Sequence, residues 1–363
     1  MNDGMWLWLA LVDLVILTAF AMLGIWQRRI LLGVYVPPAH RGDAEVVAMR
    51  RSYVWTVVAV LALVAAAGSV ALWLLPEALE TVLAGTFSLQ FVAAIAVYGR
   101  FHHRARALKA QAEWGGPSQP ARRVASLTYR RELGQPGLRW YAVHLGVVAV
   151  SVVAAALMWD RIPEVFAIHF NVRGEADGWS ERTVQGVFGQ NLVQLVLIAI
   201  FAGTATAIGR MRQQLDPDDP QRSLAKRKQY NRLSAYFLWA LSLLVTLFLS
   251  LLQGMTLYGW PQRWALGLGL ALPLVILIAV GLFLYQLRSK GLESIGDEQA
   301  QADRYWRLGG LVYYNPADPA LLVEKRVGVG MTVNFARPLS WLLLGAVLAV
   351  ASGTALIAIL TSG

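Results

Sequence analysis

Eight stretches of this chain are apolar over about the length that crosses a lipid bilayer. A membrane helix needs about 20 consecutive, mostly apolar residues. Buried helices of a large soluble core are the alternative explanation, but charged segments separate all eight runs, and this alternation favours membrane spans. The predicted spans are Met5–Trp26, Tyr53–Leu74, Val82–Tyr98, Trp140–Trp159, Asn191–Gly209, Ala235–Leu257, Trp264–Gln286 and Leu339–Leu360.

The composition supports the same class of protein. Of the 363 residues, 57% are hydrophobic and 15% are charged, whereas soluble domains carry about 25% charged residues. A disordered chain, a nucleic-acid-binding domain and an ordinary soluble enzyme are therefore excluded. The chain has no cysteine, which excludes disulfides and thiolate sites. We expect an all-α polytopic membrane protein with about eight transmembrane helices, a small ordered outer loop and a small cytoplasmic β-hairpin segment.

The basic residues predict the orientation of these spans. Of the 32 Lys and Arg residues, 28 lie in the first, third, fifth and seventh loops, and four lie in the loops between them. Cytoplasmic loops carry the excess of Lys and Arg, so we expect the odd loops inside and both termini outside. The net charge of +10 is then explained by topology and not by a nucleic-acid partner. A bacterial plasma (inner) membrane is the expected location.

The spans and loops divide the chain into five expected parts. The first is a three-helix region with basic loops, and the second is a two-helix unit with an outer loop at 160–190. A second two-helix region, a cytoplasmic hairpin segment and a final helix follow. Their bounds are 1–138, 139–210, 211–287, 288–338 and 339–363.

The outer loop after the fourth span carries most of the chemically distinctive residues outside the membrane. Pro163 should end any continuation of the span, and residues 167–171 alternate enough to predict a short strand. Arg173-Gly174 and Asp177-Gly178 are typical of turns. We therefore expect a compact cap at the outer membrane face.

This loop resembles a small bacterial membrane domain of unknown function. That domain occurs in SdpI-type bacteriocin-immunity proteins and in many uncharacterised relatives. Its pattern is a proline, a His-Phe pair and then Gly-x-x-Asp close to a span. The resemblance rests on Pro163, His169, Phe170, Asn171, Gly174, Asp177 and Gly178. It implies a non-enzymatic SdpI-like protein that acts in peptide or toxin immunity, or in signal sensing.

Three roles are open for His169. It could bind a metal together with Glu164, Glu175 and Asp177, since imidazole and carboxylates are zinc-type ligands. Glu164 and His169 are five residues apart, which does not place them on one helix face, so His169 and Asp177 are weak metal candidates. The ring could instead bond to turn backbone or to Asp177, or it could contact a partner. We expect no cofactor.

The long seventh loop predicts a β-hairpin against the inner membrane face. Residues 321–327 read as a strand, Gly328-x-Gly330 as its turn and 331–335 as the returning strand. The segment resembles a second domain of unknown function, found near the C-terminus of relatives of the first. That resemblance rests on Tyr313, Asn315, Pro316, Asp318, Pro319, Lys325, Arg326, Gly328, Gly330, Thr332 and Asn334. The two glycines lack the third glycine and following helix of a dinucleotide fingerprint.

A few polar residues fall at membrane depth. Asp13 is the only acid within a predicted span, and such residues are functional candidates by default; it either reaches water or is protonated. His144 lies one turn from the cytoplasmic end of its span, where it could reach the interface. Gln190, Asn191 and Gln194 could hold helices together or line a vestibule below the outer loop.

Three functions remain open from the sequence. The first is the SdpI-like role, with an extracellular peptide or toxin as ligand and a cytoplasmic regulator as second partner. The second is a small-solute transporter or channel that uses the amide-rich end of the fifth span as an entrance. The third is a membrane-embedded metal-dependent enzyme that uses His169 with Asp177. Besides such partners, the lipid bilayer is the expected environment.

Overall fold

The computed structural model describes residues 3–26, 29–114, 137–170, 176–210, 219–259, 262–292, 303–327 and 330–345. Seven helices in these ranges are long and apolar enough to cross a membrane, which confirms an all-α polytopic architecture. They are α1 (Asp3–Ile25), α2 (Ala44–Leu74), α3 (Leu79–Gln111), α4 (Ala142–Leu157), α5 (Val184–Arg210), α6 (Pro220–Tyr258) and α7 (Gln262–Ser289). The eighth predicted span begins as helix at 338–345, and its remainder lies outside the described residues.

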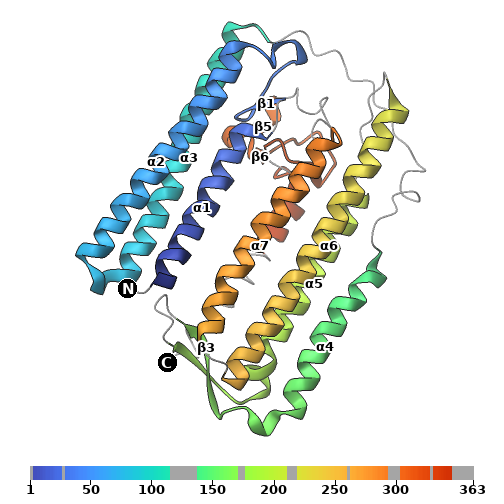
Figure 1. Ribbon diagram of the computed structural model, residues 1–363. Coiled ribbons are helices and arrows are strands. Elements are labelled where there is room, and N and C mark those ends of the chain that lie inside the picture. The colour runs from blue at the N-terminus through green and yellow to red at the C-terminus, as the bar shows by residue number, and fades with distance from the viewer. Residues whose placement is uncertain are drawn as a thin grey trace.

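The helices form two groups that α7 connects (Figure 1). In the first group, α2 packs against both α1 and α3. In the second group, α4, α5 and α6 pack against one another, and α7 contacts α6 on one side and α1 on the other.

Short two-stranded sheets lie at the two ends of this helical body (Figure 1). One end carries β3 (Val165–Phe170) and β4 (Ala176–Glu181), which pair antiparallel; we call it the hairpin end. The opposite end, the basic end, carries three small hairpins within the described residues. Their strands are β1 (Ile30–Leu31), β2 (Val34–Tyr35), β5 (Trp306–Arg307), β6 (Val312–Tyr313), β7 (Leu322–Glu324) and β8 (Met331–Val333).

Three helices continue well beyond their apolar stretches at the basic end. Helix α2 starts nine residues before the predicted span, α3 continues to Gln111, and α6 starts at Pro220. Segments interpreted as basic loops are therefore partly helical. Arg, Lys, Gln, Ala and Leu are all good helix formers, and a hydropathy window detects only the part of a helix that lies in lipid.

The β1–β2 hairpin is not predicted by any pattern in the sequence. Its turn residues Leu32 and Gly33 both have positive φ, at 48° and 86°, as a two-residue turn of the primed type requires. The strand residues Leu31 and Val34, and Val36 just after β2, are buried against side chains of α2 and α3. With only two residues in each strand, this hairpin depends on the helices that cover it.

The seventh loop contains the predicted hairpin in shortened form, as β7 paired with β8. A further hairpin, β5–β6, joins it through a parallel bridge between Tyr313 and Asn334. From the sequence we expected this segment to lie against the inner membrane face. In the structure it docks onto the β1–β2 turn and α3, where Gly310 and Gly33 lie close together.

Candidate functional site

The His-Phe motif of the hairpin end lies where the two strands shift register. Ala167 pairs with Trp179, His169 with Gly178, and Phe170 with Ala176. Ile168 is therefore an extra residue on β3, and Asp177 is an extra residue on β4. Such bulges redirect side chains, and here the His169 Nδ1 lies 2.5 Å from the Asp177 Oδ1. Both side chains are exposed, at 72% and 41%.

Gly178 permits this close approach. A Cβ atom at position 178 would lie 2.8 Å from the Cβ of His169, so a larger residue would separate the strands. The prediction that Asp177-Gly178 forms a turn is wrong, because both residues belong to β4. An Asp-Gly pair occurs in turns and also in β-bulges where the glycine allows a close approach of the partner strand, so the pair alone does not distinguish the two. The predicted site residues Asn171 and Gly174 lie outside the described residues, as does the side chain of Phe170.

The hairpin is fixed to the helices beneath it by one buried face. Phe166 packs in a core with Ala155 of α4, Val187 of α5 and Leu257 of α6. Arg182 donates a hydrogen bond of 3.0 Å to the Ile162 carbonyl, just before Pro163. Pro163 itself is exposed and follows a short 3-10 turn that ends at Arg161. The hairpin is thus anchored to three helices while His169 and Asp177 remain accessible.

Below the hairpin, an amide cluster links α4, α5 and α6. Asn191 donates to the Oε1 of Gln253 at 3.0 Å and to the Ser151 hydroxyl at 2.8 Å. Gln253 donates back to the Asn191 Oδ1 at 2.8 Å, and Gln194 donates to the Thr246 carbonyl at 3.1 Å. These contacts match the interhelical role that the sequence left open for Asn191 and Gln194. Gln190 adds a bond of 2.7 Å to the Leu249 carbonyl.

Two further membrane-depth residues have partners on neighbouring helices. Asp13 of α1 accepts a hydrogen bond of 2.9 Å from the buried Gln90 of α3. His144 is fully buried, with its Nε2 2.7 Å from the Ser242 hydroxyl of α6. The expectation that His144 reaches the interface is therefore wrong. The ring instead packs beside Tyr141 and Trp239, which fill the space around it.

At the basic end, the residues of the Tyr-x-Asn-Pro-x-Asp-Pro segment mostly bond to one another and to Asn334. Asn334 accepts from the Asn315 backbone N–H at 3.0 Å and donates to the Asn315 and Asp318 carbonyls. Tyr313 donates to Asp318 at 3.0 Å, and burial raises the pKa of Tyr313 to about 12. Asn315 and Asn334 are buried. Their role is to hold the loop around Pro316 and Pro319 in shape.

The other residues of that motif surround the hairpin turn. Thr332 lies in β8, opposite Val323 of β7. Gly330 has a φ of 103°, a conformation that favours glycine, and its carbonyl accepts from the Lys325 N–H. Gly328 lies outside the described residues.

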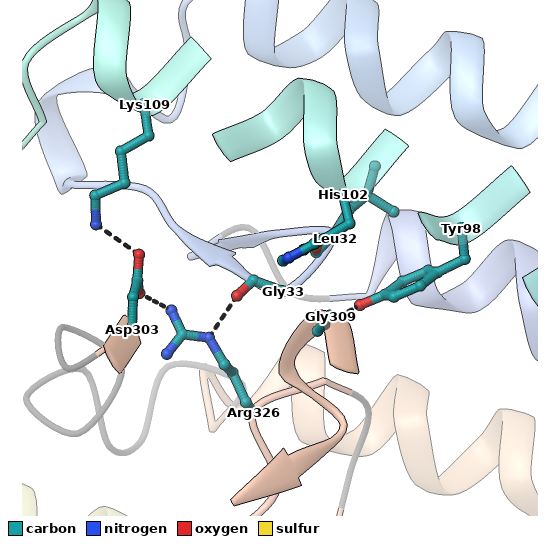
Figure 2. A network of polar contacts seen from close by, with 8 residues as sticks. All are labelled: Leu32, Gly33, Tyr98, His102, Lys109, Asp303, Gly309 and Arg326. Carbon is teal, nitrogen blue, oxygen red and sulfur yellow. Dashed lines mark hydrogen bonds and ion pairs between the residues drawn. The ribbon is translucent and has the colours of Figure 1, made fainter. Parts of the chain in front are cut away.

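Arg326 connects this loop to the first helical group (Figure 2). Its Nε donates to the Gly33 carbonyl at 2.6 Å, and its Nη2 pairs with Asp303. Asp303 also accepts from Lys109 of α3 at 2.7 Å. Only 1% of the Arg326 side chain is exposed, and burial lowers the pKa of Arg326, against the opposing effect of Asp303. We call Arg326, Asp303, Lys109 and Gly33 the Arg326 cluster.

Two more contacts of α3 reinforce this docking (Figure 2). The Tyr98 hydroxyl donates to the Gly309 carbonyl at 2.5 Å, and the His102 Nδ1 lies 2.7 Å from the Leu32 carbonyl. Helix α3 therefore contacts the two loops at three positions along its length, through Tyr98, His102 and Lys109.

Sequence reasoning missed several of these partners. From the sequence, Lys109 is only one of the many basic residues of the third predicted loop, and Gly33 and Asp303 belong to no motif. Gln90 and Gln253, by contrast, each interrupt an otherwise apolar stretch. That interruption is a usable signal, since an amide in lipid requires a hydrogen-bonding partner.

The comparisons with known proteins identify two uncharacterised domains. A domain of unknown function (DUF1648) matches residues 146–195, and a family of unknown function (DUF5808) matches residues 316–341. No curated protein and no solved structure matches the chain. The first match contains the hairpin with part of the amide cluster. The second contains Arg326 and Asn334 and begins one residue after Asn315, the bonding partner of Asn334. The chain therefore carries both uncharacterised domains in a helical membrane-type architecture.

Proposed function

We propose that this protein is a non-enzymatic bacterial membrane receptor of the SdpI-like class, which binds an extracellular peptide at the hairpin end. The observation that carries the proposal is the anchored hairpin with its accessible His169–Asp177 pair. With Nδ1 engaged by Asp177, the ring presents its other nitrogen to a ligand. Trp179 and Ile168 on the same hairpin are also exposed, at 52% and 44%, and provide apolar contact area for a peptide.

The exposure of this pair favours binding over catalysis. A His oriented by an Asp is also the arrangement of a general base. Catalytic sites, however, exclude water in order to strengthen their electrostatic interactions, whereas 72% of the His169 side chain is exposed. A peptide that covers the hairpin would bury these exposed side chains, which have no covering partner within the described part of the protein.

Helix α6 is the element that connects the two ends in this proposal. Its 39 residues extend over about 58 Å at 1.5 Å per residue. Leu257, near its end, packs beneath the hairpin. Tyr230, near its start, packs with Trp26 and Leu292, which lie at the ends of α1 and α7. The ends of α1 and α7 lead into the two loops that the Arg326 cluster joins. A displacement of α6 would therefore move both loops.

The basic loops support an orientation with the basic end in the cytoplasm. In this orientation the hairpin faces the outside of the inner membrane. A toxin arriving from outside would meet the hairpin, and a cytoplasmic regulator would meet the loops around Arg326. Immunity and sensing then differ only in whether the second partner is required.

A survival assay tests the proposal. Cells that lack the gene are challenged with peptide toxins encoded beside it or produced by neighbouring strains, and are complemented with wild type, His169→Ala or Asp177→Asn. We expect the wild type to restore survival, as should the control variant Glu181→Gln, whereas His169→Ala and Asp177→Asn should not. Glu181→Gln is the matched control, because Glu181 is an exposed acid of the same hairpin, opposite Val165. Equal survival of all strains across the panel would reject immunity, and rescue by His169→Ala would reject the hairpin as the binding surface.

A further inference from the structure

The turn between β5 and β6 exposes two leucines, and one of them, Leu308, has an unfavourable backbone conformation. Leu308, Gly309 and Gly310 all have positive φ, at 46°, 71° and 87°. Non-glycine residues rarely adopt this conformation, which costs of order 1 kcal/mol or more. The Leu308 side chain is 75% exposed and that of Leu311 is 50% exposed. Packing within the protein therefore does not account for a leucine at position 308, where glycine would fit without strain.

Contacts with α3 place this turn at the edge of the hydrocarbon core. Gly309 accepts a hydrogen bond from Tyr98, and Tyr98 lies 19 residues along α3 from its first residue, Leu79. At 1.5 Å per residue the separation is about 28 Å, close to the roughly 30 Å thickness of the hydrocarbon core. Glu77 and Glu80 mark the water-facing start of this helix. Leu308 therefore lies at the depth where acyl chains meet headgroups.

Two arginines flank the leucines in fixed positions. The guanidinium of Arg307 lies 4.3 Å from the centre of the Tyr314 ring, and that of Arg304 lies 4.6 Å from the centre of the Tyr305 ring. Both arginines are exposed, and within the described part of the chain no ion pair engages either of them. The Arg304 Nη2 also donates a hydrogen bond of 2.7 Å to the Tyr305 hydroxyl. A guanidinium has five N–H groups, so the others remain available for phosphate oxygens.

We propose that this turn binds the acidic phospholipid leaflet at the basic end. Leu308 and Leu311 insert among the acyl chains, and Arg304 and Arg307 bind headgroup phosphates. The apolar side chains, the depth along α3 and the positive charge all match this one occupant. Cation-rich segments beside a membrane are attracted to acidic lipid in this way. The proposal does not depend on a ligand at the hairpin end.

The absence of native cysteine allows a direct test of depth. Leu308→Cys is spin-labelled and reconstituted into vesicles with equal parts of phosphatidylcholine and phosphatidylglycerol. We expect relaxation by oxygen, which concentrates in the bilayer, to exceed relaxation by a water-soluble nickel chelate. Lys325→Cys is the control, because Lys325 is exposed at the same end, and its label should show the reverse order. A label at position 308 that nickel reaches as readily as at position 325 overturns the proposal.

Lipid selectivity tests the arginines. In nanodiscs of the same mixture, native mass spectrometry measures how much phosphatidylglycerol remains bound to the protein. We expect roughly fivefold weaker retention for each of Arg304→Gln and Arg307→Gln, the effect of one cation near an acidic surface. Arg232→Gln is the matched control, since Arg232 also lies over a ring, that of Tyr236, without adjacent exposed leucines. An equal loss in the control, or displacement of the lipid by inorganic phosphate, would contradict a specific leaflet contact.

Leu308→Gly separates the proposed contact from folding. Glycine accepts a φ of 46° without strain, so this variant should unfold in detergent at the same or a higher temperature than wild type. A spin label at Leu311→Cys should nevertheless become more accessible to nickel when Leu308→Gly is added. A label whose accessibility is unchanged by Leu308→Gly would show that Leu308 does not hold the turn in the leaflet.

Discussion

At the hairpin end, His169 and Asp177 are eight residues apart in one hairpin and both are exposed. At the basic end, Arg326 reaches across 293 residues of the chain to Gly33, and its side chain is almost fully buried. A surface pair of the first kind contributes little to stability, whereas a buried charge depends on every partner. The hairpin end can therefore change its contacts freely, while the basic end holds the loop after α7 on the first helical group.

Removal of Arg326 should have the largest effect. Arg326→Met removes one of the two cations that pair with Asp303, so that Lys109 alone remains beside the carboxylate, and it leaves the Gly33 carbonyl without its donor. Breaking a buried pair costs about 3–5 kcal/mol; because Asp303 is 35% exposed, we expect the lower part of that range. Thermal unfolding of the purified protein in detergent measures the loss.

Lys325→Met is the control for this experiment. Lys325 is exposed and adjacent in sequence, so its replacement should change the unfolding free energy by no more than about 0.5 kcal/mol. If Arg326→Met unfolds at the temperature of wild type, the Arg326 cluster does not hold the loops on the first helical group.

The next largest effect is expected from a glycine substitution. Gly33→Ala at the basic end should lower the unfolding free energy more than Gly178→Ala at the hairpin end. Alanine at Gly33 would need a positive φ and would place its Cβ 2.0 Å from the Gly309 carbonyl oxygen, so we expect a loss of about 2–3 kcal/mol. Alanine at Gly178 would meet only the His169 Cβ, at 2.8 Å, and the strands there can separate. We expect Gly178→Ala to cost about 1 kcal/mol and to disturb the hairpin alone.

Hydrogen exchange of backbone amides distinguishes these two outcomes. Gly33→Ala should raise exchange in the loops at 303–327 as well as around residue 33. Gly178→Ala should raise exchange only between residues 165 and 181. If both variants raised amide exchange over equally large parts of the chain, the hairpin end would not be more local than the basic end.

The sequence predicted the spans because lipid forces backbone groups into helices, so apolar length alone is informative. It also predicted β7–β8 and β3 in outline, because in each case a short run of strand-forming residues is bounded by turn residues within one segment of the chain. It did not predict β1–β2, whose four strand residues are stabilised by α2 and α3 and not by their own pattern. The partner of Arg326 also escaped prediction, because nothing in residues 29–36 marks the Gly33 carbonyl as an acceptor.

For the candidate site, sequence reasoning named His169 and Asp177 but not the geometry that joins them. The two register shifts around His169 and Gly178 depend on how β4 lies over β3, and a Gly after Asp is equally typical of a turn. Asn191 and Gln194 were named as a cluster, but Ser151 and Gln253 complete it from other helices. Residues were thus predictable where one segment supplied the pattern, and not where several helices meet.

The smallest effect on stability is expected at the exposed pair itself. Asp177→Asn keeps the shape of the side chain and removes the charge beside His169. Since exposed pairs contribute about 0–1 kcal/mol, its unfolding temperature in detergent should match that of wild type closely.

The same variant should lose peptide protection in cells, because Asp177 orients the ring that a ligand meets. A variant that is destabilised as much as Arg326→Met would show that the pair is structural. A stable variant that still protects cells would remove Asp177 from the binding surface, and only the combination of full stability and lost protection fits a receptor whose binding end is separate from its structural end.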